Sequence, residues 1–356
     1  INAPVSSDQE LAEIHRRVVA AGGPALLFNN VEGANFPCAT NLFGTPQRVE
    51  MAFGIRPERF IKQLVQIAQD LPTLSPGKLW DHRSIVPEAL RVGMKTVRSG
   101  PIAEVVQREP DLTRIPMLKT WPEDGGHFVT LPLVYTHHPD TGHHNLGMYR
   151  IQRHDARTVG VHWQIQKGGG FHYHVAEQRD QALPMTLFVG GPPALMLSAI
   201  APLPEDLPEL VLASLLQGER LRRIDHAEAK LPLVAEAEFA ICGLVPPHVR
   251  KPEGPFGDHY GYYSLQHDYP ILQVDRIFHR KDAIFPATVV GKPPQEDLFL
   301  GTYIQELMAP TPPWWGLSGG TKLSIWELGG GKTVRPYWAR FFADERAGAA
   351  AALVYA

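Results

Sequence analysis

The run Phe128-Val-Thr-Leu-Pro-Leu-Val-Tyr135 opens a region in which β-prone segments follow one another at short intervals. The further runs of this kind are Leu146–Gln152, Thr158–Gln166, Pro184–Val189, Glu236–Val245, Tyr269–His279 and Ala283–Val290. The residues His154 to Arg157 separate two of them and predict a hairpin tip. One helix is expected to interrupt the series at Leu207–Leu216. Many short strands at close spacing favour an antiparallel barrel or sandwich over a doubly wound parallel sheet.

The residues before this region alternate between helix and strand signals. Ser7 and Glu10 have the spacing of a capping box, which predicts a helix that ends at Gly22-Gly23. Ala25–Phe28 is expected to form a buried strand, and a second helix is expected to begin near Pro57. The first 95 residues therefore predict an α/β region.

Composition limits the classes of protein to which the chain belongs. It has 356 residues and a formal charge of −3, which disfavours a nucleic-acid or membrane-surface protein because these carry a basic face. No apolar run spans a bilayer and no signal peptide opens the chain, so at most peripheral membrane contact is expected. Two distant cysteines, Cys38 and Cys242, indicate a reducing, cytoplasmic compartment. The chain begins at Ile1, so we expect its true start to be missing.

Nine of the 16 histidines lie between His127 and His174. Two interpretations stay open. Surface turns are favoured because His138-Pro-Asp-Thr-Gly142 has the composition of a turn. The alternative is a histidine-bound metal, as in a non-haem metal enzyme, although adjacent histidines in a strand point to opposite faces and each pair would supply one ligand.

The segment Glu253-Gly-Pro-Phe-Gly-Asp258 places two carboxylates five residues apart around two glycines and a proline. Two carboxylates held close together do not easily both ionise, so one of them keeps a proton near neutral pH. Such a proton is what a general acid needs. On its own, the segment favours an ordinary turn over an acid site.

This segment resembles a motif of the UbiD family of decarboxylases, which use prenylated FMN. The stretches Asn145-Leu-Gly-Met-Tyr-Arg150 and His162-Trp-Gln-Ile-Gln-Lys-Gly-Gly169 resemble two more. Additional matches are Gly22-Gly-Pro-Ala-Leu-Leu-Phe28, Asn41-Leu-Phe-Gly-Thr45, Ile115-Pro116, Trp121-Pro-Glu-Asp124, Gly190-Gly-Pro-Pro-Ala194, Ala201-Pro-Leu-Pro204 and Gly291-Lys-Pro-Pro-Gln-Glu-Asp297. The resemblance covers about residues 8–308.

The resemblance implies an α+β protein with three parts. These are an N-terminal α/β domain at residues 1–95, a flavin-reductase-like split β-barrel that binds the flavin at residues 96–300, and a partial or atypical C-terminal region at residues 301–356. After about Met308 the chain departs from the family's pattern, with Pro310-Thr-Pro-Pro-Trp-Trp315, glycine runs and alanines at 349–352. A second departure is Gln166, where many relatives carry a histidine near the metal.

The resemblance also assigns roles to residues. Asn145 and Glu209 would bind a divalent metal, Mn²⁺ or Mg²⁺, with K⁺ as a further ion. Arg150 would hold the substrate carboxylate and pair with Glu253, and Asp258 would protonate the carbon that loses CO₂. An ionised Glu253 is expected to raise the pKa of Asp258. Contacts to prenylated FMN are expected from Met148, Tyr149, Arg150, His162, Trp163, Gln164, Lys167 and Gly168.

The implied reaction is reversible, non-oxidative decarboxylation of an aromatic acid. The leading substrate is 4-hydroxy-3-polyprenylbenzoate, which would give 2-polyprenylphenol in ubiquinone biosynthesis. The alternatives are another aromatic or α,β-unsaturated acid, or a flavin-binding subunit without turnover. The resemblance further implies dependence on a flavin prenyltransferase and assembly as a homo-oligomer, a dimer or a hexamer.

Overall fold

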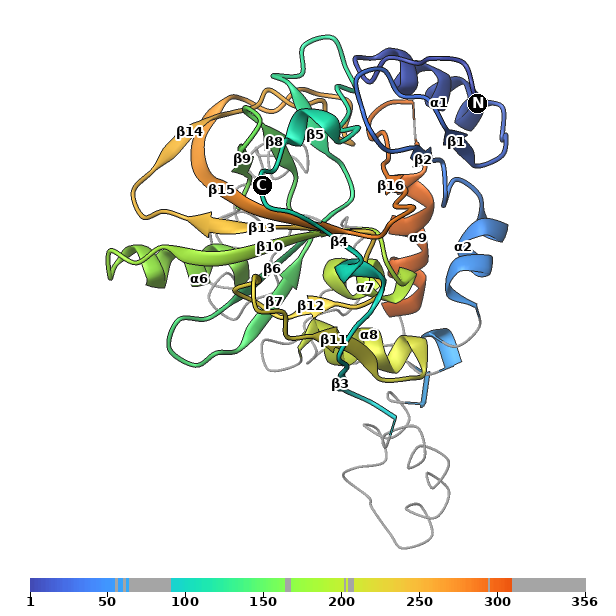
Figure 1. Cartoon of the computed structure of the whole chain (residues 1–356). Helices are drawn as coiled ribbons and strands as arrows, with labels where there is room; N and C mark the ends of the chain where they lie inside the picture. The colour runs from blue at the N-terminus through green and yellow to red at the C-terminus, as the bar shows by residue number, and fades with distance from the viewer. Residues whose placement is uncertain are drawn as a thin grey trace, which may run out of the picture.

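A curled antiparallel sheet lies at the centre of the molecule, with helices packed beside it (Figure 1). The computed structural model describes residues 1–54, 57–59, 62–63, 91–163, 168–201, 203, 208–293 and 295–308. Within these residues the protein is a mixed α+β structure, as the sequence predicts. The finer expectation, a flavin-reductase-like split barrel with the three domain boundaries given above, stays a prediction.

The central sheet has ten strands. Eight follow one another in the order β5 (His127–Val129), β8 (Ile151–Arg153), β9 (Thr158–Val161), β15 (His267–His279), β13 (Phe239–Val245), β10 (Leu183–Val189), β6 (Pro132–His137) and β7 (His144–Gly147). The other two, β4 (Val105–Gln107) and β14 (Arg250–Glu253), also pair with β15. Strand β15 is long enough to pair with four strands, and its register with β13 shifts between Cys242 and Gly243.

The predicted strands are found, although most are shorter or divided and β10 and β15 begin one and two residues earlier than predicted. The run 128–135 divides into β5 and β6, and β6 begins at Pro132, which lacks the amide proton that a ladder position in mid-strand would need. The predicted hairpin tip joins β8 to β9 as expected, with Asp155 accepting hydrogen bonds from the Arg157 amide and the Thr158 hydroxyl. The last predicted strand is reduced to the two residues of β16 (Phe285–Pro286).

The N-terminal region has α1 (Glu10–Ala20) and a small sheet of β1 (Leu26–Phe28), β2 (Cys38–Thr40) and β16. The predicted capping box is wrong at Ser7, because the Glu10 carboxylate accepts the amide of Ser6 at 2.8 Å and no side chain caps the helix. Helix α2 (Pro46–Phe53), which was not predicted, is capped by Thr45. Most of the helix predicted from Pro57 lies outside the described residues.

Four further helices and a second small sheet complete the described structure. The helices are α6 (Gly168–Glu177), α7 (Pro193–Ile200), α8 (Glu209–Gln217) and α9 (Asp297–Met308). The strands of the sheet lie in the order β12 (Leu233–Val234), β11 (Leu221–Ile224) and β3 (Met94–Thr96). Single-turn 3₁₀ helices occur at Pro101–Ala103 and Leu112–Arg114. Helix α8 is the helix predicted at Leu207–Leu216, whereas α6 and α7 were not predicted.

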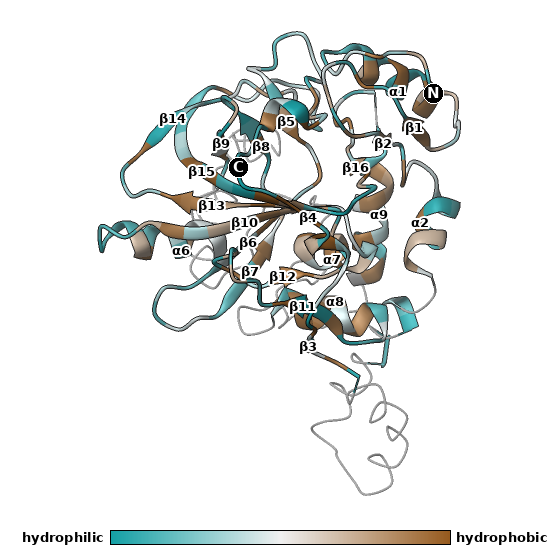
Figure 2. Cartoon of the chain, in the orientation of Figure 1, coloured by the Kyte–Doolittle hydropathy of each residue, from teal (hydrophilic) through white to brown (hydrophobic). Residues whose placement is uncertain are grey.

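Two apolar cores lie on opposite sides of the central sheet. One joins Phe188 of β10 to Leu195 of α7 and Leu212 of α8, and the other joins Leu187 of β10 to Phe28 and Phe285 of the N-terminal sheet. Adjacent β10 residues therefore enter different cores, as strand alternation requires. In Figure 2, hydrophobic residues, coloured brown, are concentrated along the central strands. No described helix has the length and apolar character to cross a membrane.

Candidate active site

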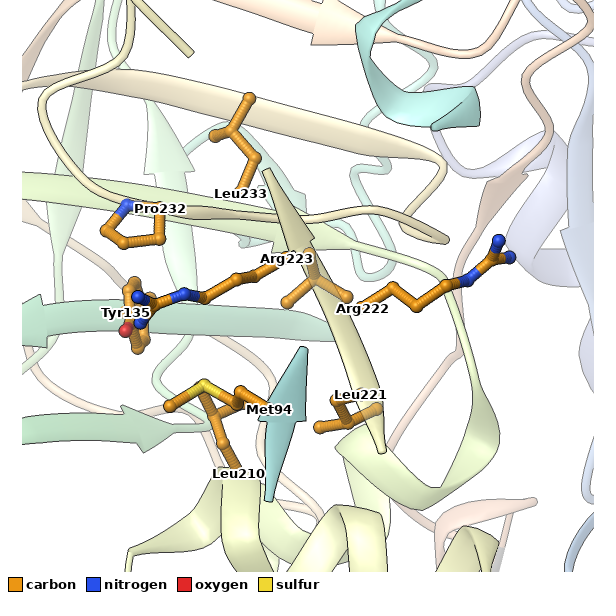
Figure 3. Close-up of a pocket in the computed structure, with 9 residues that line it drawn as sticks. Met94, Tyr135, Leu210, Leu221, Arg222, Arg223, Pro232 and Leu233 are labelled. Atoms are coloured by element: carbon orange, nitrogen blue, oxygen red, sulfur yellow. The ribbon is translucent and has the colours of Figure 1, made fainter. Parts of the chain in front are cut away.

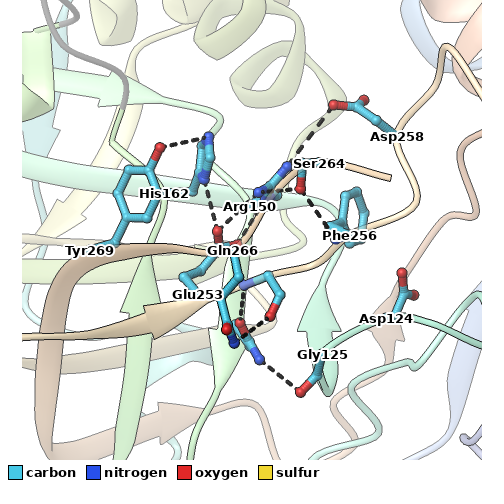
Figure 4. Close-up of polar contacts among 12 residues, drawn as sticks. Asp124, Gly125, Arg150, His162, Glu253, Phe256, Asp258, Ser264, Gln266 and Tyr269 are labelled. Atoms are coloured by element: carbon cyan, nitrogen blue, oxygen red, sulfur yellow. Dashed lines mark hydrogen bonds and ion pairs between the residues drawn. The ribbon is translucent and has the colours of Figure 1, made fainter. Parts of the chain in front are cut away.

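A buried ion pair joins two residues that are 103 positions apart. Arg150, which directly precedes β8, donates from Nε to Glu253 Oε1 at 2.8 Å and from Nη2 to Glu253 Oε2 at 2.9 Å. Glu253 ends β14 and is fully buried. Arg150 Nη2 also donates to Ser264 Oγ at 2.9 Å (Figure 4). The structure thus brings together the predicted Arg150–Glu253 pair.

Glu253 is held in the ionised state. Burial alone would raise its pKa, but hydrogen bonds from Arg150 and His162 lower that pKa to about 2. The His162 Nδ1 atom lies 2.9 Å from Glu253 Oε2, and its Nε2 atom lies 3.5 Å from the Tyr269 hydroxyl. His162 was expected to contact the cofactor; here its ring bonds to the buried carboxylate.

Asp258 approaches the same arginine from the other side. Its Oδ2 atom is 4.0 Å from Arg150 Nη1, and its Oδ1 atom accepts the His259 amide at 2.7 Å and contacts Nδ1 of the His259 ring. Burial raises the pKa of Asp258, but the contact with His259 outweighs it and lowers the pKa below the ordinary value. The expected rise is therefore wrong for the site as it stands, because the adjacent imidazole stabilises the carboxylate.

Tight backbone packing fixes the loop that carries the two acids. Gly254 adopts φ = +92°, and a Cβ at Gly125 would lie 2.1 Å from the Gly254 carbonyl oxygen. Gln152 bridges them, accepting from the Gly254 amide at 2.7 Å and donating to the Gly125 carbonyl at 3.0 Å. Asp124 accepts the Gly257 amide at 2.7 Å. Gly125 and Gly254 thus allow close approach of backbone to backbone, whereas Gly257 makes room for the Trp121 ring.

The predicted metal ligand Glu209 bonds to the backbone beside the other, Asn145. The Glu209 carboxylate, at the start of α8, accepts the amide of Leu146, the residue after Asn145 in β7. Burial raises the pKa of Glu209 to about 7, and no ion pair to it occurs among the described residues. A Cβ at Gly168 would lie 2.1 Å from Asn145 Oδ1, so only glycine allows this approach.

This donor set fits a hard divalent cation. A carboxylate that lies beside a buried amide and has no cationic partner is chemically suited to Mn²⁺ or Mg²⁺ with phosphate oxygens completing the shell. In the part of the chain that the structure describes, no three His, Cys, Asp or Glu side chains are grouped to hold a metal by themselves. Asn145 and Glu209 are the residues that would hold the ion.

The remaining cofactor residues divide into two sets. Tyr149 and Trp163 are buried, Met148 is partly buried, and Gly168 begins α6. Gln164 and Lys167 lie outside the described residues, as does Gln166. Their proposed contacts to the flavin remain predictions.

A small cavity beside β11 does not admit an aromatic acid. It is lined by Met94, Tyr135, Leu210, Leu221 and Arg223, among others (Figure 3). Its volume is about 10 Å³, which is room for about one water molecule. This cavity is therefore not a candidate substrate site.

Ring contacts join His137 to His144 and His138 to His172, but no three of the described histidines are grouped to hold a metal ion. The turn interpretation is confirmed at His138–Gly142, where the His138 amide donates to the His143 carbonyl oxygen. It is wrong for His144, which lies in β7, and for His172, which lies in α6 and is within 2.9 Å of the Thr136 hydroxyl. Burial lowers the pKa of both His144 and His172 to about 4, so both rings are neutral at neutral pH.

Replacing His143 and His144 together by Gln is expected to leave decarboxylation and bound metal within about twofold of the wild type. His143 is exposed, and His144 makes ring contacts with Tyr135 and His137 without reaching Arg150 or Glu253. Turnover rates and metal analysis of the double variant test this. Loss of all metal would instead support the histidine-bound alternative.

Three residues of the site were not found from sequence. Ser264 bonds to Arg150, Tyr269 to His162, and Gln152 bridges the glycine loop. Serine, tyrosine and glutamine are common on any surface, and no spacing pattern marks these positions. Asp124 belongs to a recognised motif, but its role in holding the Gly257 amide depends on the fold.

Two family matches cover most of the chain. Residues 95–293 match the 3-octaprenyl-4-hydroxybenzoate carboxy-lyase Rift-related domain, called UbiD, and residues 1–68 match the corresponding N-terminal domain. An uncharacterized protein of Chlamydia caviae is 50% identical over 313 residues, covering 88% of this chain and 54% of the relative. A Chlamydia pneumoniae protein, named as one of the subunits of a 4-hydroxybenzoate decarboxylase, is 50% identical over 311 residues, covering 87% of this chain and 53% of the relative.

Solved structures share the fold. An evolved dimeric form of the UbiD-class enzyme HmfF from Pelotomaculum thermopropionicum, in complex with prenylated FMN, has a TM-score of 0.74 at 24% identity, covering 86% of this chain and 67% of that one. The closed form of the vanillic acid decarboxylase of Sedimentibacter hydroxybenzoicus has a TM-score of 0.72 at 24% identity, covering 87% and 63%. The chain spans about half the length of the curated relatives it matches. By the extent of the UbiD domain match, this chain belongs to the UbiD family.

Proposed function

We propose that the protein removes CO₂ from an aromatic carboxylic acid with prenylated FMN as its cofactor. The observation that carries the proposal is the buried Arg150–Glu253 pair with Asp258 on the open side of the arginine. A fixed cation beside a titratable acid is what binding a carboxylate and then protonating a carbon require. The bound flavin would supply the electron sink for loss of CO₂.

The contacts of Arg150 define what it offers to a substrate. Its Nε and Nη2 atoms are engaged by Glu253 and Ser264, so, among the residues that the structure describes, Nη1 is the nitrogen left for a substrate carboxylate. Nη1 is also the atom nearest Asp258. A substrate carboxylate at Nη1 would remove part of the positive field from Asp258 and place an anion beside it. Both effects raise the pKa of Asp258, so Asp258 would become protonated when the substrate binds.

Asn145 and Glu209 would hold the divalent ion that anchors the flavin phosphate. Met148, Tyr149, Trp163 and Gly168 are proposed to line the flavin, with Gln164 and Lys167 beside them. Mn²⁺ is the first choice and Mg²⁺ the second, with K⁺ as a further ion. Dependence on a flavin prenyltransferase and assembly as a homo-oligomer belong to the same proposal.

The substrate class is supported by the relatives. The chlamydial relative is named for 4-hydroxybenzoate, and solved structures of similar fold include decarboxylases of vanillic acid and of 3,4-dihydroxybenzoic acid. We propose a hydroxylated benzoate, with 4-hydroxy-3-polyprenylbenzoate of ubiquinone biosynthesis as one member and small hydroxybenzoates as the second candidate. Incubation of the cofactor-loaded protein with a panel of such acids, followed by product analysis, tests this; no CO₂ release from any of them would overturn it.

Replacing Glu209 by Ala is expected to empty the metal site and release most of the flavin, because it removes the charged ligand. Loss of a ligand or its support lowers metal affinity by about 10–100-fold or more. Metal analysis and flavin absorbance of the purified variant provide the measurement. The control is Glu219→Ala, because Glu219 is an exposed residue shortly after the same helix. This variant should keep both its metal and its flavin. Full metal and flavin occupancy in Glu209→Ala would contradict the assignment.

A further inference from the structure

We propose that His162 is a positioning residue for the decarboxylation proposed above, on which this inference rests. In its neutral form, with the proton on Nδ1 and Tyr269 bound to Nε2, it holds Glu253 ionised and thereby fixes Arg150. Tyr269, His162, Glu253 and Arg150 form one continuous chain of contacts (Figure 4).

The sheet fixes the place of each member. Strands β8 and β9 are antiparallel neighbours, and the His162 amide donates to the Arg150 carbonyl oxygen at 3.2 Å, so the two residues stand opposite each other. Tyr269 belongs to β15, two positions from His267, which pairs with Glu253 of β14. The ring centroids of His162 and Tyr269 lie 4.3 Å apart, and the angle between the ring planes is 34°. This ring contact restricts the orientation of the imidazole plane, in addition to the hydrogen bonds at its nitrogens.

The hydrogen bonds select one tautomer. Glu253 is ionised and accepts, so the Nδ1 atom that faces it at 2.9 Å must carry a proton. Burial lowers the pKa of His162, so the ring is neutral and Nε2 keeps its lone pair. Burial also raises the pKa of Tyr269, so the phenol keeps its proton and is the donor to Nε2. Tyr269 therefore favours the tautomer that Glu253 requires.

The consequence for Arg150 is geometric and electrostatic. Glu253 has no exposed area, so its oxygens depend on Arg150 and His162 for hydrogen bonds. A neutral donor satisfies the carboxylate without adding charge, and the Arg150–Glu253 pair stays neutral overall. With Nε and Nη2 engaged in this way, Nη1 is held toward Asp258 and toward the place of the substrate carboxylate. Without His162, Glu253 Oε2 would keep only the bond from Arg150 Nη2, and the orientation of the pair would be less strictly fixed.

The experiment compares two substitutions that separate the donor from the ring. His162→Asn keeps a nitrogen donor at the δ position, whereas His162→Phe keeps the ring and removes the donor. We expect His162→Phe to lower kcat by about 10–100-fold with bound flavin unchanged, as for loss of a supporting hydrogen bond. His162→Asn should recover most of this loss. His267→Phe, an exposed histidine of β15, is the matched control and should match the wild type.

Imidazole nitrogen NMR gives a readout that does not depend on turnover. Among the histidine signals of the wild-type protein, those of a neutral ring protonated at Nδ1 should vanish in His162→Asn, and Tyr269→Phe should shift that ring toward a mixture of tautomers. Equal loss of kcat in His162→Asn and His162→Phe, or a His162 ring protonated at Nε2, overturns the proposal. If the wild type released no CO₂ from any acid while the Nδ1 signal was present, the proposed function would fail and the assignment of His162 to Glu253 would stand.

Discussion

Asp258→Asn is expected to lower turnover by about 10²-fold or more while leaving bound flavin and metal unchanged, as for loss of a general acid. The substitution keeps the shape of the side chain and its acceptor oxygen, but the amide has no acidic proton to deliver. Asp258 makes no contact with Asn145 or Glu209, so the proposed metal site is not disturbed. Steady-state rates and flavin absorbance measure both parts of the result.

The surroundings of Asp258 make this test informative. In the structure as described, His259 lowers the pKa of Asp258, so the acid is ionised until something changes the charge around it. The Asp258 carboxylate contacts Nδ1 of the His259 ring. A substrate carboxylate at Arg150 Nη1 would raise the pKa of Asp258, so that Asp258 takes up a proton from solvent. Proton uptake on substrate binding should therefore accompany activity and disappear in Asp258→Asn.

A matched control separates this role from a general charge effect. Asp268→Asn removes an exposed carboxylate on the neighbouring strand β15 and should leave turnover within about twofold of the wild type. Near-native turnover in Asp258→Asn, with flavin and metal bound, would contradict the assignment of Asp258 as the general acid. Glu253 or a water molecule would then be the proton donor.

The strands of the fold were predictable because their signal is local. Runs such as Pro184–Val189 and Tyr269–His279 carry apolar and β-branched residues between turn residues, and β10 and β15 follow them closely. Helix α6 was missed because it begins with three glycines, which have low helix propensity. Tyr173 and Ala176 are buried, and their packing stabilises the helix despite the low helix propensity of its first residues.

The pairing of distant residues is less accessible to sequence reasoning. Arg150 reaches Glu253 because β8 pairs with β9, β9 with β15, and β15 with β14, and no local pattern encodes that order. The family resemblance named the pair, but it did not show that His162 donates to the same carboxylate. The error at Asp258 had a visible cause in the sequence: His259 is the next residue, and an imidazole beside a carboxylate lowers its pKa.

Arg150→Lys is expected to lower turnover by about 10²-fold, although the positive charge is retained, because misplacement of a positioning group by about 1 Å has an effect of that size. Arg150 uses Nε and Nη2 as a fork on Glu253, Nη2 on Ser264, and Nη1 toward Asp258. Its guanidinium also lies 5.1 Å from the centre of the Phe256 ring. A lysine ammonium offers its donors from a single point and cannot reach these positions together.

The same change should weaken the fold as well as the reaction, since Glu253 is completely buried and would keep its charge with a poorer partner. Removing one partner of a buried pair altogether destabilises a protein by about 3–5 kcal/mol, which is an upper limit for a substitution that retains the charge. Thermal unfolding, kcat and KM are measured on the same preparation, with Arg157→Lys, an exposed arginine at the β8–β9 hairpin, as the control. A folded Arg150→Lys protein with native kcat and KM would show that charge alone suffices, and the fork on Glu253 would then have no part in the reaction.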